Sequence, residues 1–303
     1  MRPLDACKGF DAYNSIASLE KTMQRVLALH EDYPNNKNGL AGKLGKPKPY
    51  KTALEMPGMK HRAKLSGSTA RNNCVHRYNI HDAEHEQLYR EQKFSHDTLW
   101  RYPLPENIGL TIDPDDGLAI VGIKLGSTAA KSGLRAGDTL TRANGQLLTS
   151  IADLQWVLHN ISNTDTDVTL QVKRGDQAIE KKIAINAGWK KTDISWRGSL
   201  WSLKPVLATW CAQMKKEDVK NCASAKGSMR LKYGGLTQVE RKKRAGLKKG
   251  DIIVGMENKP LRLTSQQFNM HMKLKYEVGE KLPLTLLRNG KRTQFDWPLT
   301  DGD

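Results

Sequence analysis

Cysteine is scarce in this sequence, which has four cysteines among 303 residues and no two of them in a C-x-x-C arrangement. A disulfide-built scaffold, a zinc ribbon and a thioredoxin-type redox pair are therefore excluded. No apolar run approaches the roughly 18 residues that a membrane-spanning helix needs. The first residues show no apolar core followed by a small-residue cleavage site. We therefore expect neither a membrane span nor a secretory signal in this sequence.

Motifs of nucleophilic catalysis are also missing. The sequence contains neither G-x-S-x-G nor G-D-S-G-G, the patterns that surround the nucleophile of many serine hydrolases. The sequence therefore predicts a protein that is not an enzyme and carries no cofactor.

Positive charge is in excess, with 49 Lys and Arg against 32 Asp and Glu, a net charge of +17. The excess lies mainly in residues 189–303, with 24 basic against 11 acidic side chains, and in residues 34–66, with 8 against 1. A basic surface attracts phosphates, but aromatic residues are only 6% and no nucleic-acid-binding motif is present. We expect a solvated basic surface and no nucleic-acid partner. A surface that binds anionic polymers stays as an alternative.

Two helices and a linker are expected ahead of the strands. Apolar residues recur at the helical period over residues 14–31, which predicts an amphipathic helix that needs a partner surface. Residues 33–72 are rich in Pro, Gly and Lys and predict a linker. Residues 80–98 predict a polar helix.

Potential metal ligands gather around this polar helix, at Cys74, His76, His81 and His85. His81 and His85 are one helical turn apart and could face one ion, and HDAEH matches the H-x-x-E-H pattern of some zinc proteases. Patterns of five letters arise by chance, and no downstream acidic ligand motif stands out. A solvated helix is therefore the preferred interpretation, and no metal is predicted.

From about residue 105 the sequence changes to short strands separated by turn residues, and it repeats itself. The stretch Ser132–Leu140 recurs as Ala245–Ile253, offset by 113 positions. With one residue inserted, Leu154 and Leu158 match Phe268 and Met272, and the hairpin VKRGDQ matches LLRNGK. Two copies of one module of about 80 residues are predicted.

The order of elements in each copy resembles a PDZ domain of the bacterial type. Gly133 is suited to end a helix and Gly137 to form a left-handed turn, and Asp138 can bond turn amides. The resemblance implies a half-open barrel in which a guest peptide adds as a strand between a strand edge and the longer helix. Amides of the preceding loop would hold the terminal carboxylate of the guest.

The resemblance places the binding loop and strand of the first copy at residues 105–112. The candidate peptide-binding residues are Ile108, Gly109, Leu110, Thr111, Ile112, Ile151, Leu154, Gln155 and Leu158. Because apolar helix positions are usually core, Leu154 and Leu158 could instead belong to the core, and both interpretations stay open. The second copy lacks an obvious loop before Met229–Tyr233. Its groove, if formed, would be lined by Ser265, Phe268, Asn269 and Met272.

The wider sequence resembles bacterial proteins that fuse a thioredoxin-like domain to tandem PDZ modules. The matching stretches are YNSIASLEKTMQRVLALHEDYP, CVHRYNIHD, LWRYPLPENIGLTID, SIADLQWVLHN and GWKKTDISWRGSLW. The resemblance implies that helix 14–31 is the last helix of a thioredoxin-like domain that is otherwise absent here, and it implies an extracytoplasmic location. This bacterial family resembles haem proteins because it carries the haem-attachment motif C-x-x-C-H. In the present sequence the motif begins at Cys74, but Arg77 replaces its second Cys and Tyr78 replaces its His, so it cannot attach haem.

We therefore predict a mainly β chain with short helices, an N-terminal helix and a basic linker, and two half-open barrels in tandem. The predicted parts are a thioredoxin-like remnant (1–32), a linker and polar helix with a degenerate Cys-His motif (33–98), a first PDZ domain (99–188), a Trp-rich segment (189–226) and a second PDZ domain (227–300). Trp189, Trp196, Trp201 and Trp210 are expected to pack the two copies together, and Cys211 and Cys222 could pair or stay free. The predicted function is a scaffold whose first PDZ domain binds extended peptides or protein C-termini. A truncated remnant of a thiol-redox or haem-carrying protein is the alternative.

Overall fold

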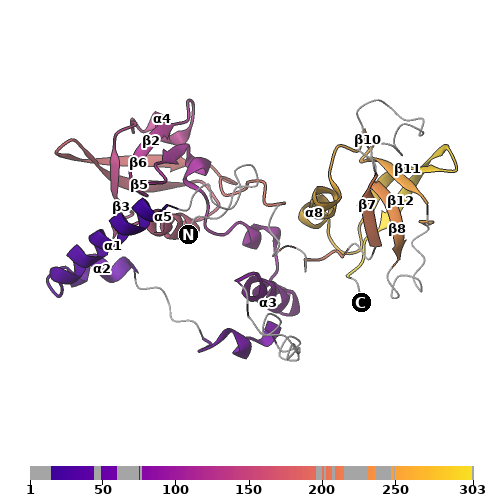
Figure 1. Cartoon of the computed structure of the whole chain (residues 1–303), viewed down its shortest axis with the longest axis horizontal. Helices are drawn as coiled ribbons and strands as arrows, with labels where there is room; N and C mark the ends of the chain where they lie inside the picture. The colour runs from indigo at the N-terminus through magenta and orange to yellow at the C-terminus, as the bar shows by residue number, and fades with distance from the viewer. Residues whose placement is uncertain are drawn as a thin grey trace. The chain divides into compact units, whose positions relative to one another are not determined.

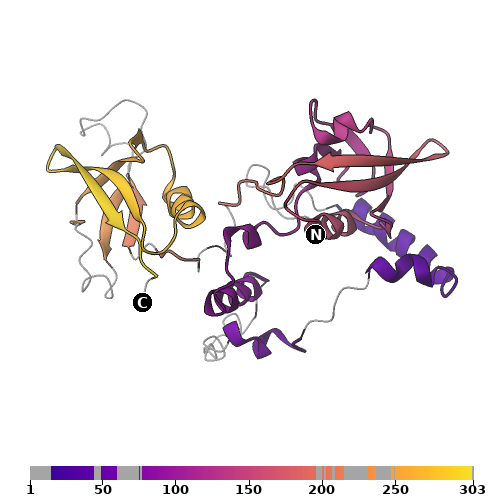
Figure 2. The ribbon, with the colours of Figure 1, turned by 180° about the vertical axis from the view of Figure 1, so that it is seen from behind.

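The structure is a computed structural model and describes residues 15–43, 49–59, 75, 77–195, 200, 203–206, 209–214, 231–236, 247–248 and 250–301. The chain divides into two compact units, one formed by residues 1–49 and 95–193 and the other by residues 50–94 and 194–303. Each unit contains a small antiparallel sheet with a helix beside it (Figure 1 and Figure 2). We call the strands and helices of residues 110–185 the first module, and those of residues 209–298 the second module.

The first module contains a two-stranded and a four-stranded sheet. The pair consists of β1 (Leu110–Ile112) and β2 (Ile120–Ile123). The larger sheet has the order β4 (Gln146–Leu147), β3 (Thr139–Ala143), β5 (Thr166–Arg174) and β6 (Gln177–Ile185). An isolated bridge between Ala119 and Thr139 joins the two sheets, and α4 (Thr128–Lys131) and α5 (Ile151–Asn160) complete the module. Alternate side chains of β5, such as Val168, Leu170 and Val172, point into one core.

The turn before β3 has the predicted geometry. Gly133 and Gly137 have φ angles of +77° and +92°, and the Asp138 carboxylate accepts a hydrogen bond from the Arg135 amide at 2.9 Å. The structure adds a contact that sequence analysis missed: Arg174, at the end of β5, donates from Nε and Nη2 to the same carboxylate at 2.7 and 2.9 Å. Because Asp138 is only 1% exposed, this pair holds the turn to the sheet.

The second module forms one sheet of six strands, with the order β12, β11, β9, β8 and β7 and with β10 beside β9. The strands are β7 (Thr209–Gln213), β8 (Leu231–Leu236), β9 (Ile252–Met256), β10 (Lys259–Pro260), β11 (Lys281–Arg288) and β12 (Lys291–Pro298). Helix α8 (Ser265–Lys275) places Phe268 and Met272 in the core of this module, where both are fully buried.

The turn before β9 makes the same contacts as the turn before β3. Asp251 accepts from the Lys248 amide at 2.7 Å and from Nε and Nη2 of Arg288 at 2.8 and 2.7 Å. Gly250 has a φ of +99°. The helices α5 and α8 also begin alike, since each has a capping box at its first turn. The two modules therefore share their turn, their ion pair and their helix start.

Strand β7 lies within residues 189–226, the range predicted to be an inter-module segment, yet it is an edge strand of the second sheet. Its partner β8 follows after a long insertion, so the strand could not be aligned with the first copy from sequence. Trp189 contacts the core of the first module. Trp196, Trp201 and the side chain of Trp210 lie outside the described residues.

The N-terminal segment attaches to the first module through polar groups. It comprises α1 (Ile16–Glu31), α2 (Lys37–Leu40) and η1 (Ala41–Lys43). Arg25 of α1 pairs with Asp116 at 2.8 Å, and Lys43 pairs with Asp153 at 2.7 Å. The apolar stripe predicted for α1 is exposed: Ile16 is 86% and Leu19 is 60% accessible. None of the helices in the described ranges is long and apolar enough to cross a membrane.

Part of the predicted linker packs in the second unit. There η2 (Ala53–Glu55) and η3 (Pro57–Met59) precede α3 (Arg77–Arg90), and Met56 and Met59 are buried with Ala83. A Cβ on Gly58 would collide with the Ala83 carbonyl group, so glycine permits this close approach. The run of Met, Pro and Gly has no apolar period, which is why sequence analysis predicted a linker here.

Replacing Asp138 by Asn should destabilise the first module by about 3 kcal/mol, because Arg174 loses its partner and the turn loses charge-assisted bonds. Asp176→Asn is the matched control: its side chain is fully exposed in the turn between β5 and β6, so a change below about 0.5 kcal/mol is expected. Urea denaturation of the full chain measures both. Equal stabilities of the two variants would contradict this role of Asp138.

The same pair predicts a pH dependence. Hydrogen bonds from Arg174 lower the pKa of Asp138 below its ordinary value of 3.8. The stabilisation is therefore complete above about pH 4 and is lost as the pH falls through the lowered pKa of the folded state. In Asp138→Asn, the loss of stability between pH 5 and pH 2 should be smaller than in the unaltered chain. An identical loss would show that this carboxylate contributes nothing to acid unfolding.

Candidate functional site

One edge of β1 is the candidate site. The Gly109 carbonyl accepts from the Lys124 amide at 2.9 Å, and the Asp113 amide donates to Ala119 at 2.8 Å, so both residues point their backbone groups toward β2. The backbone groups of successive residues in a strand point to opposite edges. A β-bulge interrupts the pairing of β1 with β2, but its extra residue, Val121, lies on β2, so the alternation along β1 is kept. The backbone groups of Leu110 and Ile112 therefore face the other edge. None of the described strands pairs with that edge.

The loop before β1 is built around Gly109. A short 3-10 helix, η6 (Pro105–Ile108), ends at this glycine, which has a φ of +90°. A Cβ at Gly109 would collide with the Ser127 side chain, and Ser127 caps α4 by accepting from the Ala130 amide. The loop is thus pressed against the start of α4, with its backbone close to the free edge of β1.

Lys124 is a cation next to this loop that sequence analysis missed. Its amide bonds to Gly109, its Cβ would lie 3.6 Å from a Cβ at Gly109, and its side chain is exposed. Only the pairing of β1 with β2 brings Lys124 to the loop, so no sequence pattern marked it.

The predicted residues of α5 are mostly buried. Leu154 and Leu158 are fully buried in the same core as Leu110 and Ile112. This burial favours the interpretation that both leucines belong to the core and do not line a groove. Ile151 is half-buried and Gln155 is 2% exposed. Ile108 and Gly109 are buried, and Thr111 is exposed. The structure therefore offers backbone groups rather than large side chains for recognition at β1.

The chain's own segments flank the C-terminal part of α5. Gln155 donates to the Tyr102 carbonyl at 3.2 Å, and the Tyr102 ring lies 4.6 Å from that of His159. Asn107 donates to the carbonyls of Trp189 and Lys190 at 3.1 and 3.2 Å. We call residues 100–104 the lead-in segment of the first module, because they run directly into the loop before β1.

A matching edge exists in the second module at β7. Thr209 and Trp210 pair with Leu236 and Gly235 before a register shift, just as Leu110 and Thr111 pair with Ile123 and Gly122 before a shift. Cys211 therefore occupies the position of Ile112. It is a free thiol, and burial raises its pKa to about 12. Cys222 lies outside the described residues.

The candidate metal ligands do not come together in the described residues. Cys74 and His76 lie outside them. His81 contacts Glu84 at 3.4 Å, and His85 is buried beside the Phe94 ring. The described part of the chain contains no group of three or more His, Cys, Asp or Glu side chains that could hold a metal ion.

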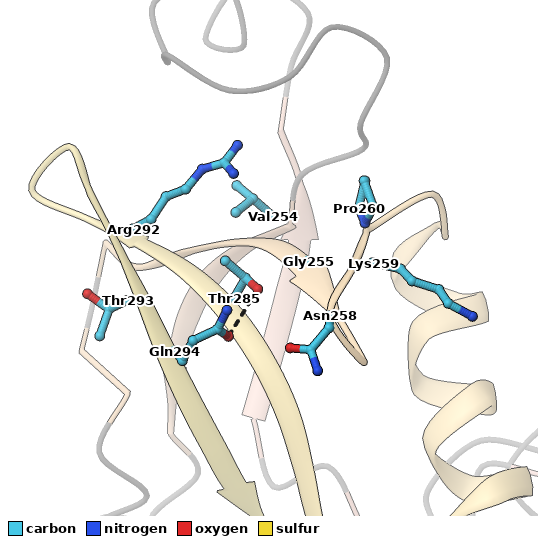
Figure 3. A pocket seen from close by; sticks show the side chains of 9 residues that line it. All are labelled: Val254, Gly255, Asn258, Lys259, Pro260, Thr285, Arg292, Thr293 and Gln294. Atoms are coloured by element: carbon cyan, nitrogen blue, oxygen red, sulfur yellow. Dashed lines mark hydrogen bonds between the residues drawn. The ribbon is translucent and has the colours of Figure 1, made fainter.

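A shallow cavity of about 330 Å³ lies on β9–β12, away from β7 (Figure 3). Its floor contains a hydrogen bond from Thr285 to Gln294 at 3.1 Å, and Arg292 and Lys259 are its cations. In Figure 3 the Lys259 side chain points away from Thr285 and Gln294. The lining residues are Val254, Gly255, Asn258, Lys259, Pro260, Thr285, Arg292, Thr293 and Gln294.

Comparison with known proteins identifies the first module. Residues 106–185 match the PDZ domain family. The chain is 26% identical over 211 residues to a probable periplasmic serine endoprotease DegP-like of Pseudomonas savastanoi pv. phaseolicola, covering 65% of this chain and 40% of that protein. It is 27% identical over 147 residues to the periplasmic pH-dependent serine endoprotease DegQ of Escherichia coli, covering 48% and 29%. The chain thus contains a PDZ domain and has homology to DegP and DegQ proteins.

The chain spans less than half the length of these curated relatives. A solved HtrA-type protease with a decapeptide aligns at 15% identity over 44% of this chain and 40% of that one. Its TM-score of 0.26 is too low to support an argument about the fold.

Gly109→Ala should destabilise the first module by about 1–3 kcal/mol more than Gly126→Ala, because its Cβ overlaps Ser127 as well as straining φ. Gly126 is the matched control: its φ is +75°, but a Cβ there meets no atom within 4 Å. Urea denaturation of the full chain measures both variants. If both lose the same stability, the loop is not held against α4 in the way described.

Proposed function

We propose that the first module binds extended peptides or protein C-termini by strand addition to β1, without a catalytic step of its own. The free edge of β1 next to the Gly109 loop carries this proposal. The PDZ match over residues 106–185 supports it, because addition of a peptide strand to an exposed sheet edge is a recognised mode of PDZ domains.

Recognition would rest mainly on the backbone. Leu110 and Ile112 supply amides and carbonyls at the free edge, while their side chains are committed to the core. The candidate side chains of α5 that were predicted to line a groove are buried, apart from half-buried Ile151. Short peptides should then bind with a Kd in the micromolar range, which corresponds to roughly −8 kcal/mol.

The terminal carboxylate of a peptide ligand would lie close enough to Lys124 to pair with its ammonium group. Its ammonium group lies on an exposed side chain at the end of β2, opposite the loop. The absence of a side chain at Gly109 lets the loop lie against the start of α4, beside Lys124. Together these features favour a free carboxylate at the end of the peptide.

The second module is proposed to be a second PDZ domain. Its strand order, its Asp251–Arg288 pair and the register of β7 with β8 support this proposal. One position before β7 the sequence has Ala208, where the first module has Gly109. Phe268 and Met272 are buried in its core, which leaves Ser265 and Asn269 as the polar groups of α8 nearest to a ligand.

Other predictions remain as proposals. The thioredoxin-like interpretation of α1 is supported by the exposed apolar residues Ile16, Leu19, Met23 and Leu27, which would suit burial against a further surface. An extracytoplasmic location is supported by the word periplasmic in the names of both curated relatives. The haem and thiol-redox alternative concerns Cys74, which lies outside the described residues.

Strand addition can be tested by methylating the ligand backbone. A binder is first selected from a library of short peptides with apolar C-termini, and single amides are then N-methylated one at a time. Methylation of every second amide, those facing β1, should weaken binding by about tenfold or more, because each removes a ladder donor. Methylation of the intervening amides should leave the Kd nearly unchanged. Equal losses at all positions, or no binder at all, would contradict strand addition.

Lys124→Ala should weaken binding of the free-acid peptide by about three- to tenfold, as expected for a charge-assisted contact at an exposed site. The same substitution should have no effect on the peptide with an amidated C-terminus. Lys131→Ala, an exposed lysine on α4, is the matched control and should bind both peptides normally. Equal weakening for both peptides would mean that Lys124 does not pair with the carboxylate.

A further inference from the structure

Helix α3 contacts the segment that precedes β7. Asp82, His85 and Tyr89 follow one another at positions i, i+3 and i+7 and therefore share a stripe along the helix. In the chain, α3 precedes the first module, but it belongs to the compact unit that contains the second. Tyr89 of this helix contacts Lys204, in the segment that precedes β7.

Tyr89 clamps the segment that leads into β7. The Lys204 amide donates to the Tyr89 hydroxyl at 3.1 Å, and the hydroxyl donates to the Lys204 carbonyl at 3.4 Å. The Lys204 ammonium lies 5.8 Å from the centre of the Tyr89 ring, and the ring also stacks on that of Phe94, with 4.0 Å between the ring centres. Burial raises the pKa of Tyr89 to about 12, so its hydroxyl keeps the proton that it donates.

Lys273 joins α8 to the same segment. It is 1% exposed, and its Nζ donates to the Leu203 carbonyl at 2.6 Å. Burial lowers the pKa of Lys273 to about 8, and the negative charge of Asp82 on α3 acts in the opposite direction. The charge of a carboxylate on α3 therefore acts on the buried ammonium of α8. Helix α8, residues 203–204 and α3 meet at one place.

This place corresponds to the carboxylate end of the site in the first module. Leu203 stands six residues before β7, as Leu104 stands six residues before β1. Lys273 takes the position in α8 that His159 has in α5, allowing for the inserted residue. In the first module these positions lie where the lead-in segment meets the C-terminal part of α5. By the same correspondence, α3 holds residue 204, which leads into β7, through Tyr89, and it places the charge of Asp82 where it acts on Lys273 of α8.

We propose that α3 is an intramolecular strap that closes the peptide-binding edge of the second module, and that a peptide reaches β7 only when α3 detaches. In this proposal, Asp82 of α3 supplies the negative charge that a peptide carboxylate would otherwise bring toward Lys273. This inference rests on the proposed function of the second module as a PDZ domain. It makes the two edges unequal, since β1 is open and β7 is closed until the strap is released.

Hydrogen exchange of the full chain, followed by mass spectrometry, tests the strap. Tyr89→Ala should speed exchange in residues 203–213 by about tenfold, with a smaller increase in Tyr89→Phe, which keeps the ring and loses only the hydroxyl bonds. Exchange in β11 and β12 should stay unchanged, which excludes global unfolding. Arg90→Ala, an exposed residue of α3 that is 52% accessible, is the matched control. Unchanged exchange in residues 203–213 of both Tyr89 variants would overturn the strap.

A second measurement adds a peptide with an apolar C-terminus. It should protect β1 in every chain, and it should protect β7 only in Tyr89→Ala. Equal protection of β7 in the unaltered chain would overturn the strap, because the edge would already be open. A different result would be faster exchange in residues 203–213 of Tyr89→Ala without protection of β7 by the peptide. It would contradict the peptide-binding function of the second module and the closure inferred from that function. The contact of α3 with Lys204 would still stand.

Discussion

The unpaired backbone edge of β1 is the feature on which the proposed recognition depends. Gly109 and Asp113 use their backbone groups toward β2, so Leu110 and Ile112 must present theirs on the opposite side. The side chains of these two residues are buried in the core. The site is therefore rigid where a guest strand would form its hydrogen bonds, and little side-chain ordering is needed when it binds.

The turns that precede β3 and β9 explain how both modules can support such an edge. In each, a buried carboxylate joins a turn amide to an arginine at the end of a hairpin strand, Asp138 with Arg174 and Asp251 with Arg288. The carboxylate keeps its charge because the guanidinium lowers its pKa. The modules differ instead near the edges proposed for ligands: Ala208 stands in the sequence where the first module has Gly109, and α3 contacts the segment before β7.

Sequence predicted the local features well because they depend on a few neighbouring residues. The end of α4 just before Gly133, the positive φ angle of Gly137 and the bond from the Arg135 amide to Asp138 all follow from turn and capping chemistry. Long-range placements were not predictable in this way. β7 is separated from β8 by a long insertion, and the packing of Met56 and Met59 on α3 has no periodic signal. The role of Lys124 depends on strand pairing, and the clamp of Tyr89 on Lys204 joins residues 115 positions apart.

Residue-resolved amide exchange of β1, measured by NMR with and without a bound peptide, tests the central claim most directly. Bound peptide should slow exchange of the Leu110 and Ile112 amides, which face the open edge. The Thr111 and Asp113 amides face β2 and should change little, since they need no new partner. Protection that is uniform along residues 110–113, or absent from Leu110 and Ile112, would contradict strand addition at this edge.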